Sequence, residues 1–214
     1  MMLAFFVVSI NFADAETLTL SDPSSFQSYS QSGMTAALDS ARMFNGVSTI
    51  KITKNSGQYA GLTFSSVDPI SSVSYYQYDE FGTSSPFYNY IFLYDSPTSS
   101  KWLVWRDSGY NGTIGADGGE NFFPYGSLAR TVGWQKVEAI MDSSYINFKL
   151  NDVLVARFAS TNPIEKVAFD ISGGGSNVSY NISPVTITTV PEPSALSLLA
   201  VGLGGLTILR RRRS

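Results

Sequence analysis

Residues 133–155 read GWQKVEAIMDSSYINFKLNDVLV, three strand-like segments separated by two short turns. The alternation and the β-branched and aromatic residues predict strands over Trp134 to Met141, Tyr145 to Leu150 and Val153 to Phe158. Asp142-Ser143-Ser144 separates the first two. Asn151-Asp152 separates the last two, and this pair favours a tight turn because asparagine and aspartate visit the left-handed region of the backbone.

The same pattern continues on both sides of this stretch. Only residues 33–44 suggest a short helix instead. About ten strands at short spacing predict an all-β fold, a jelly-roll β-sandwich that occupies residues 16–189. The other predicted strands are Val47 to Thr53, Gly61 to Ser65, Val73 to Tyr78, Tyr88 to Tyr94, Lys101 to Arg106, Glu165 to Ile171 and Val178 to Thr189.

The stretch from Gly133 resembles the core hairpins of concanavalin A-like and laminin-G-like jelly rolls. In those domains a Gly-Trp-His-Lys-type strand is followed by a strand that ends in Asp-Gly. Here Gln135 stands in place of the histidine and Asn151-Asp152 in place of Asp-Gly. The resemblance implies a lectin-like sandwich.

The end of the chain has three ordered features. Val190-Pro191-Glu192-Pro193 is followed by 16 apolar or small residues, Ser194 to Leu209, and then by Arg210, Arg211, Arg212 and Arg213. An ordinary membrane-spanning helix needs roughly 20 residues, so we expect a short, marginal transmembrane helix. Arginines at its end are typical of a stop-transfer signal held at the cytoplasmic face.

These features resemble the PEP-CTERM sorting signal of exported proteins in Gram-negative bacteria that make exopolysaccharide. The resemblance covers residues 190–214 and implies that an exosortase reads Pro191, Glu192 and Pro193. It also implies an inner-membrane-anchored precursor that is then delivered to the cell surface or the extracellular biofilm matrix. An ordinary C-terminal anchor is the alternative.

The beginning of the chain also favours export through the Sec machinery. Residues 1–10 are almost wholly apolar, and Ala13-Asp14-Ala15 is the small-x-small pattern that signal peptidase recognises, so we expect a signal peptide over residues 1–15. No lysine or arginine precedes Arg42, which suggests a truncated n-region and a start codon placed too late.

Composition excludes several functions. The chain has no cysteine and no histidine, which removes disulfides, serine-histidine catalysis and histidine-ligated zinc. Its formal net charge is −3, and the four terminal arginines make the part before them more acidic still. A nucleic-acid partner is not expected, because such a partner requires a basic patch.

Aromatic side chains can stack on sugars. Tyr88, Tyr90, Phe92 and Tyr94 share one face of a predicted strand, and we interpret them as core or sheet-bracing residues. Loops carry binding sites more often than strands. We therefore expect a carbohydrate site at Trp105, Tyr110 and Tyr125, which flank the glycine-rich stretch 107–119.

Oxygen donors lie in and beside the same stretch. Asp107, Asn111, Asp117 and Glu120 could hold calcium, although their spacing differs from an EF-hand loop and such residues are common in turns for backbone reasons. No other cofactor is expected.

Enzymatic activity is not expected from the sequence. Jelly-roll laminarinases place their carboxylates as Glu-x-Asp-x-x-Glu, which is absent, and the adjacent Asp79 and Glu80 would point to opposite faces of a strand. We therefore predict an exported, non-enzymatic protein that binds polysaccharide. A purely structural matrix protein and a carboxylate-dependent hydrolase or lyase are the alternatives.

Overall fold

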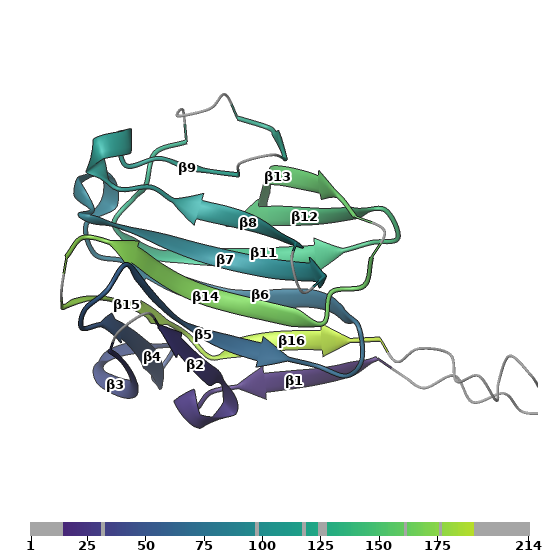
Figure 1. The fold of residues 1–214 in the computed structure, drawn as a ribbon, viewed down its shortest axis with the longest axis horizontal. Helices are drawn as coiled ribbons and strands as arrows, with labels where there is room; N and C mark the ends of the chain where they lie inside the picture. Colours follow the sequence, from purple (N-terminus) through teal and green to yellow (C-terminus); the bar gives the residue numbers. More distant parts are fainter. Residues whose placement is uncertain are drawn as a thin grey trace, which may run out of the picture.

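The computed structural model describes residues 15–30, 33–96, 99–116, 119–123, 128–160, 162–175 and 177–190. They form two antiparallel sheets that face each other across one core (Figure 1). The predicted all-β sandwich is therefore confirmed. The signal peptide and the sorting tail, with its predicted helix, lie outside the described residues.

Sheet A has ten strands and sheet B has six. Sheet A contains, in spatial order, β10 (Glu120–Asn121), β13 (Val153–Ala159), β12 (Tyr145–Leu150), β11 (Gly133–Met141), β6 (Ile70–Asp79), β15 (Val178–Ile182), β4 (Val47–Lys54) and β3 (Met34–Phe44), with β16 (Val185–Thr189) joining β6 to β1 (Glu16–Leu20). Sheet B contains β2 (Gln27–Ser30), β5 (Tyr59–Ser65), β14 (Lys166–Gly173), β7 (Phe87–Ser96), β8 (Ser99–Trp105) and β9 (Ile114–Gly115). Three 3₁₀ turns, η1 (Pro23–Ser25), η2 (Gly82–Ser84) and η3 (Ser108–Tyr110), complete the described part.

The hairpin predicted at Asn151-Asp152 is present between β12 and β13. Both residues have positive φ, 48° and 67°, as a two-residue turn of the favoured hand requires. The side chain of Asn151 also accepts a hydrogen bond from the backbone N–H of Lys136, at 2.8 Å. The local sequence and the tertiary fold therefore agree here.

The predicted helix over residues 33–44 is wrong. Residues 34–44 form β3, which pairs with β4 from Met34 opposite Lys54 to Phe44 opposite Val47. Alanine, leucine and methionine favour a helix only weakly, and pairing with a neighbouring strand overrides that preference. The register shifts between Asp39 and Met43, a bulge at the edge of sheet A.

The core lies between the inner faces of the two sheets. Phe169 of β14 is fully buried and meets Phe26 and Tyr75 edge to face, with ring centroids 6.0 and 4.9 Å apart. Ile50 and Ile52 of β4 are buried in the same core. Because this core spans both sheets, it fixes which residues of each strand point outward.

Candidate functional site

Trp105 does not lie on an open surface. It is 0% exposed, and its indole N–H donates to the side-chain oxygen of Gln135 at 2.8 Å. A ring with no exposed area offers no face to a sugar, so its predicted place in the binding site is corrected. Gln135, which departs from the histidine of the lectin-like pattern, satisfies the buried indole.

Tyr110 is the exposed member of the predicted site. It ends η3, is 57% exposed, and its ring lies 5.9 Å from that of Tyr88 at the start of β7. Asn111 follows with a positive φ of 60° and ends this turn. Tyr125 and Asp117 lie outside the described residues.

Two of the predicted calcium ligands, Glu120 and Asp107, make other contacts in the structure, Glu120 through its side chain and Asp107 through its backbone. Glu120 of β10 accepts two hydrogen bonds from the guanidinium of Arg157, at 2.6 and 3.1 Å. The carbonyl of Asp107 accepts from the N–H groups of Tyr110 and Gly112 at the η3 turn. Within the described part of the chain, no three acidic, histidine or cysteine side chains form a metal-binding group. Calcium binding stays a prediction.

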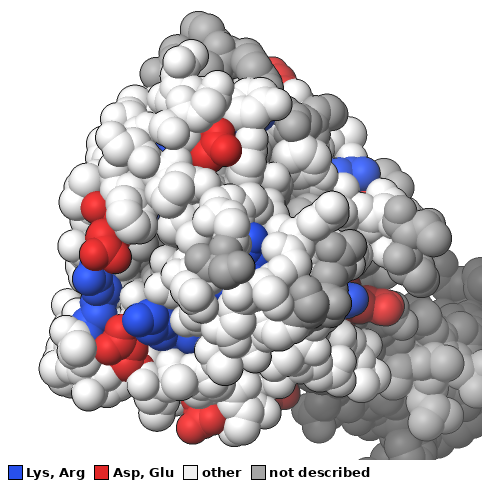
Figure 2. Space-filling model, turned by 60° about the vertical axis from the view of Figure 1, so that its left-hand side comes forward, with Lys and Arg blue, Asp and Glu red and all other residues white. Residues whose placement is uncertain are grey.

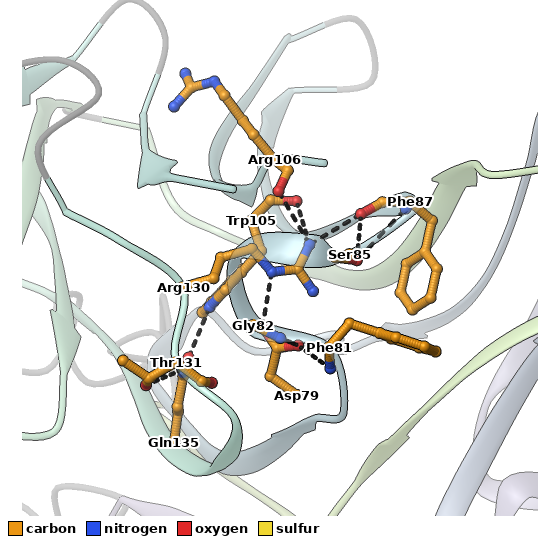
Figure 3. Close-up of polar contacts among 10 residues, drawn as sticks. All are labelled: Asp79, Phe81, Gly82, Ser85, Phe87, Trp105, Arg106, Arg130, Thr131 and Gln135. Atoms are coloured by element: carbon orange, nitrogen blue, oxygen red, sulfur yellow. Dashed lines mark hydrogen bonds and ion pairs between the residues drawn. The ribbon is translucent and has the colours of Figure 1, made fainter. Parts of the chain in front are cut away.

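A buried ion pair between Arg130 and Asp79 lies where the loop that contains Tyr110 leaves β8 (Figure 3). Arg130 Nε lies 2.7 Å from Asp79 Oδ2, and neither side chain is exposed. Arg130 Nη1 donates to the carbonyls of Phe87 at 2.9 Å and Arg106 at 3.1 Å. The other oxygen of Asp79 accepts from the backbone N–H of Gly82 at 2.9 Å. This clamp joins the ends of β6, β7 and β8, next to Tyr110.

A row of aromatic side chains lies on the outer face of sheet B. We call it the β7 aromatic row, and it consists of Tyr88, Tyr90, Phe92 and Tyr94 of β7 with Trp102 of β8. Its members are half-buried, while the alternate residues of β7 are buried. Neighbouring ring centroids along β7 lie 6.1, 5.1 and 6.3 Å apart, and Trp102 lies 5.8 Å from Tyr90.

The four β7 residues share one face, and of the two environments expected for them, core or sheet-bracing, they do not occupy the core. Their face is outward, because the core is filled by Phe87, Ile91 and Leu93 on the other face. The sequence does contain a signal for this. One face of β7 carries isoleucine and leucine, and the other carries three tyrosines, whose hydroxyl groups require a partner or solvent when the rings are packed.

Asp170 lies in the middle of the same outer face. It sits on β14 opposite Tyr90 of β7 on one side and Gly61 of β5 on the other. Tyr29 of β2 lies across Gly61, and its hydroxyl donates to Asp170 Oδ2 at 2.5 Å. A Cβ on Gly61 would come within 2.8 Å of the Tyr29 ring, so glycine is what allows this contact. This cluster was not predictable from the sequence pattern, because Tyr29 and Asp170 lie 141 residues apart.

Burial controls the ionisation of Asp170. The residue is 5% exposed, and burial raises the pKa of its carboxyl to about 7, although the Tyr29 hydrogen bond and the positive charge of Lys54 lower it. The pKa of Tyr29 is raised by burial and by the neighbouring Asp170. The outer face of sheet B therefore carries a carboxyl that gains or loses its proton near neutral pH.

A groove of about 680 Å³ lies at the far end of the β7 aromatic row. Tyr94 belongs both to the row and to the groove lining, and Lys166 Nζ lies 4.5 Å above the ring of Tyr94. Asp95, paired with Lys101 at 3.3 Å, and Glu165 add polar groups. The row thus runs from Tyr110 at one end of the sandwich to a polar groove at the other.

Charges are sparse and mixed on the face that Figure 2 shows. Basic and acidic side chains lie next to each other there and form no basic patch.

The tail matches a known family profile. Residues 189–213 match the PEP-CTERM protein-sorting motif, so the chain carries this motif and is an exported protein that is processed at a membrane. No helix in the described residues is long and apolar enough to cross a membrane. Pro191–Pro193 and Arg210–Arg213 themselves lie outside the described residues. A search of curated proteins found no match.

Three solved structures of similar fold are a sialidase, an endo-glucanase and a carbohydrate recognition domain. A sialidase shares 15% identity over 77% of this chain with a TM-score of 0.54, and the chain spans 17% of the sialidase. A family 16 endo-glucanase from Bacteroides ovatus shares 10% identity, with a TM-score of 0.50 over 83% of this chain and 97% of its own. The metal-free carbohydrate recognition domain of Emp46p shares 9% identity, with a TM-score of 0.50 over 77% and 88%. At these identities the likeness shows the fold alone.

The expectation of a non-enzymatic protein is contradicted by this comparison. The fold is shared with a sialidase and an endo-glucanase as well as with a recognition domain. Absence of the Glu-x-Asp-x-x-Glu spacing therefore does not exclude catalysis, because a fold fixes neither the presence nor the position of catalytic groups.

Proposed function

We propose that this chain is an exported protein that an exosortase processes and that binds polysaccharide through the outer face of sheet B. The observation that supports it most is the β7 aromatic row, which continues through Tyr88 to Tyr110. The half-buried rings of the row and the exposed ring of Tyr110 present contiguous apolar area to solvent, and large contiguous apolar patches mark interaction sites.

The geometry of the row suits an extended sugar chain. From Tyr88 to Tyr94 the strand advances about 20 Å, at roughly 3.4 Å per residue. Rings spaced along this distance offer consecutive apolar platforms for pyranose faces, and polar groups near them orient hydroxyls. Lys166 at the end of the row is such a polar group.

Glycan binding by the released protein tests the proposal. Trp102→Ala and Tyr90→Ala should each weaken binding to the host's own exopolysaccharide by about tenfold or more, the loss expected for central aromatic contacts. Trp134→Ala is the matched control, because Trp134 is a half-buried tryptophan on sheet A, where it contacts Phe44 and Tyr78.

Equal affinity of the Trp102 and Trp134 variants would place the binding site elsewhere. Absence of glycan binding by the unaltered protein would favour a purely structural matrix protein.

Asp170 favours a second function, carboxyl-dependent cleavage of the bound polysaccharide. A carboxyl with a pKa of about 7 keeps a proton at neutral pH. Because Asp170 is 5% exposed and Tyr29 is bound to its Oδ2, this function also requires that Tyr29 move aside to let a sugar reach the carboxyl. Release of reducing ends or unsaturated sugars from the host polysaccharide, lost in Asp170→Asn with glycan binding retained, would support this function. Binding without any release would leave the chain a polysaccharide-binding protein.

A further inference from the structure

We propose that one end of the sandwich is a docking surface for the enzyme that processes the tail. We call it the tail end, and it consists of Val67, Pro69, Asp142, Tyr145 and Val190. The inference rests on the sorting part of the proposed function and is independent of the glycan site.

Both ends of the sandwich chain meet at the tail end. β16 finishes at Thr189, opposite Glu16, the first residue of β1. The backbone N–H of Val190 donates to the carbonyl of Pro69 at 2.9 Å, so the chain is held in place up to the residue before the motif. In Figure 1 β16 and β1 lie side by side at the same end.

The distance from this end to the apolar run is short. Three residues lie between Val190 and Ser194, and the four steps from one Cα to the next span at most about 14 Å when fully extended. Any enzyme that grips Pro191-Glu192-Pro193 at a membrane must therefore approach the tail end closely. A folded domain held so near the scissile region is either an obstacle or a part of the recognised surface.

The shape of the tail end favours recognition. A groove of about 480 Å³ opens there, and Val190, Pro69, Asp142 and Tyr145 are in its lining. Val67, two residues before Pro69, is 97% exposed, and Tyr145 and Val190 are also exposed. A groove bordered by exposed apolar side chains is typical of a protein-binding site.

The charge of the tail end favours a protein rather than lipid. Asp68 follows Val67, and Asp142 lies in the groove, where hydrogen bonds from the backbone N–H groups of Ser144 and Tyr145 lower the pKa of its carboxyl. Asp142 therefore stays ionised. Carboxylates disfavour adsorption on anionic lipid, because the membrane surface attracts basic segments and repels acidic ones.

Pulse-chase of the full chain in an exosortase-bearing host tests this. Val67→Asp should slow conversion of the membrane precursor to released protein by about fivefold, the effect of one contact of moderate weight. Val132→Asp is the matched control. It is also an exposed valine in a loop, 64% exposed, but it precedes β11 at the opposite end of the sandwich. Its release rate should equal that of the unaltered chain.

A linker insertion separates recognition from obstruction. Eight glycine and serine residues between Val190 and Pro191 would let the tail end lie up to about 28 Å farther from the motif. If the tail end is recognised, the insertion slows release, and Val67→Asp adds little to it, because the two changes remove the same contact. Faster release after insertion would overturn the proposal.

Two further outcomes complete the test. If Glu192→Ala blocks release but the Val67→Asp and Val132→Asp variants are released at equal rates, whether normal or slow, the docking surface is overturned and the sorting function is not. Normal release of Glu192→Ala would remove the sorting function and the inference with it. The melting temperature of released Val67→Asp, expected to equal that of the unaltered protein, excludes misfolding as the cause of slow release.

Discussion

Asp170 makes the stability of the sandwich depend on pH in an unusual direction. Its pKa is raised to about 7 in the folded state, from 3.8, mainly by burial. Between about pH 4 and 7 the folded state therefore holds a proton that the unfolded state has lost. The contribution of Asp170 to stability is full at low pH and disappears as the pH rises through 7.

We expect Asp170→Asn to remove this dependence. The free energy of unfolding of the unaltered protein should gain on the order of a few kcal/mol relative to the variant as the pH falls from 8 to 5. Denaturant titrations at several pH values measure it. The test compares the unfolding free energies of the two proteins at each pH, because a single protein does not isolate Asp170. The pKa values of Asp39, Asp95 and Asp142 are lowered in the folded state, so these groups make the protein more stable as the pH rises. A pH-independent difference would contradict the assignment.

Arg130 and Asp79 provide the second prediction at this scale. Arg130→Met leaves Asp79 charged and buried, which should cost about 3–5 kcal/mol of unfolding free energy. The double variant Arg130→Met with Asp79→Leu should recover a large part, because it leaves no unpaired buried charge. Chemical denaturation of both variants checks this. A double variant less stable than the single one would show that the hydrogen bonds from the backbone N–H groups of Phe81 and Gly82 to Asp79 outweigh the cost of its unpaired charge.

The sequence predicted individual residues unevenly, for a physical reason. The positive φ of Asn151 and Asp152 follows from local chemistry and was predictable. The burial of Trp105 and the position of Asp170 depend on partners 30 and 141 residues away, Gln135 and Tyr29. A candidate site that depends on such pairs requires the sheet register, which a single sequence does not provide.

The β12–β13 hairpin carries a prediction at the scale of elements. Asn151→Ala should destabilise the protein by about 1 kcal/mol, because alanine disfavours a φ of 48° and cannot accept the hydrogen bond from Lys136. Asn151→Gly tolerates the same φ and should cost less. Thermal unfolding of the two variants measures the difference. Equal destabilisation would mean that the hydrogen bond, rather than the backbone conformation, decides the effect.

Elements were predictable where local preference and pairing agree. β12 has the predicted limits, and β7 and β14 differ from theirs by one or two residues at each end. The prediction for β3 was wrong because its alanines and methionines favour a helix, whereas eight of its eleven residues pair with β4. The predicted final strand is divided into β15 and β16 at Ser183 and Pro184, since proline lacks the N–H that a continuous strand requires.

The whole molecule has a sharp boundary at its tail end. β16 pairs with β1 on one side and β6 on the other, and Thr189 is buried at 2% exposure. β1 has β16 as its strand partner in the described sheet. A chain that stops at Val190 keeps all these contacts, whereas a chain that stops at Ser183 loses β16 and leaves β1 unpaired. Ile187 and Val185, both fully buried, are lost with it.

We therefore expect the chain ending at Val190 to fold and to melt at the temperature of the released protein. The chain ending at Ser183 should be unfolded or aggregated, because two buried aliphatic side chains and two strand pairings are removed together. Circular dichroism melting and size-exclusion chromatography of both proteins measure the outcome. Cooperative folding of the Ser183 chain would mean that the sandwich does not require β1 and β16.

In that case the sorting tail would be joined to an edge strand that can dissociate from the core, and the enzyme could reach its motif after β16 separates from β6.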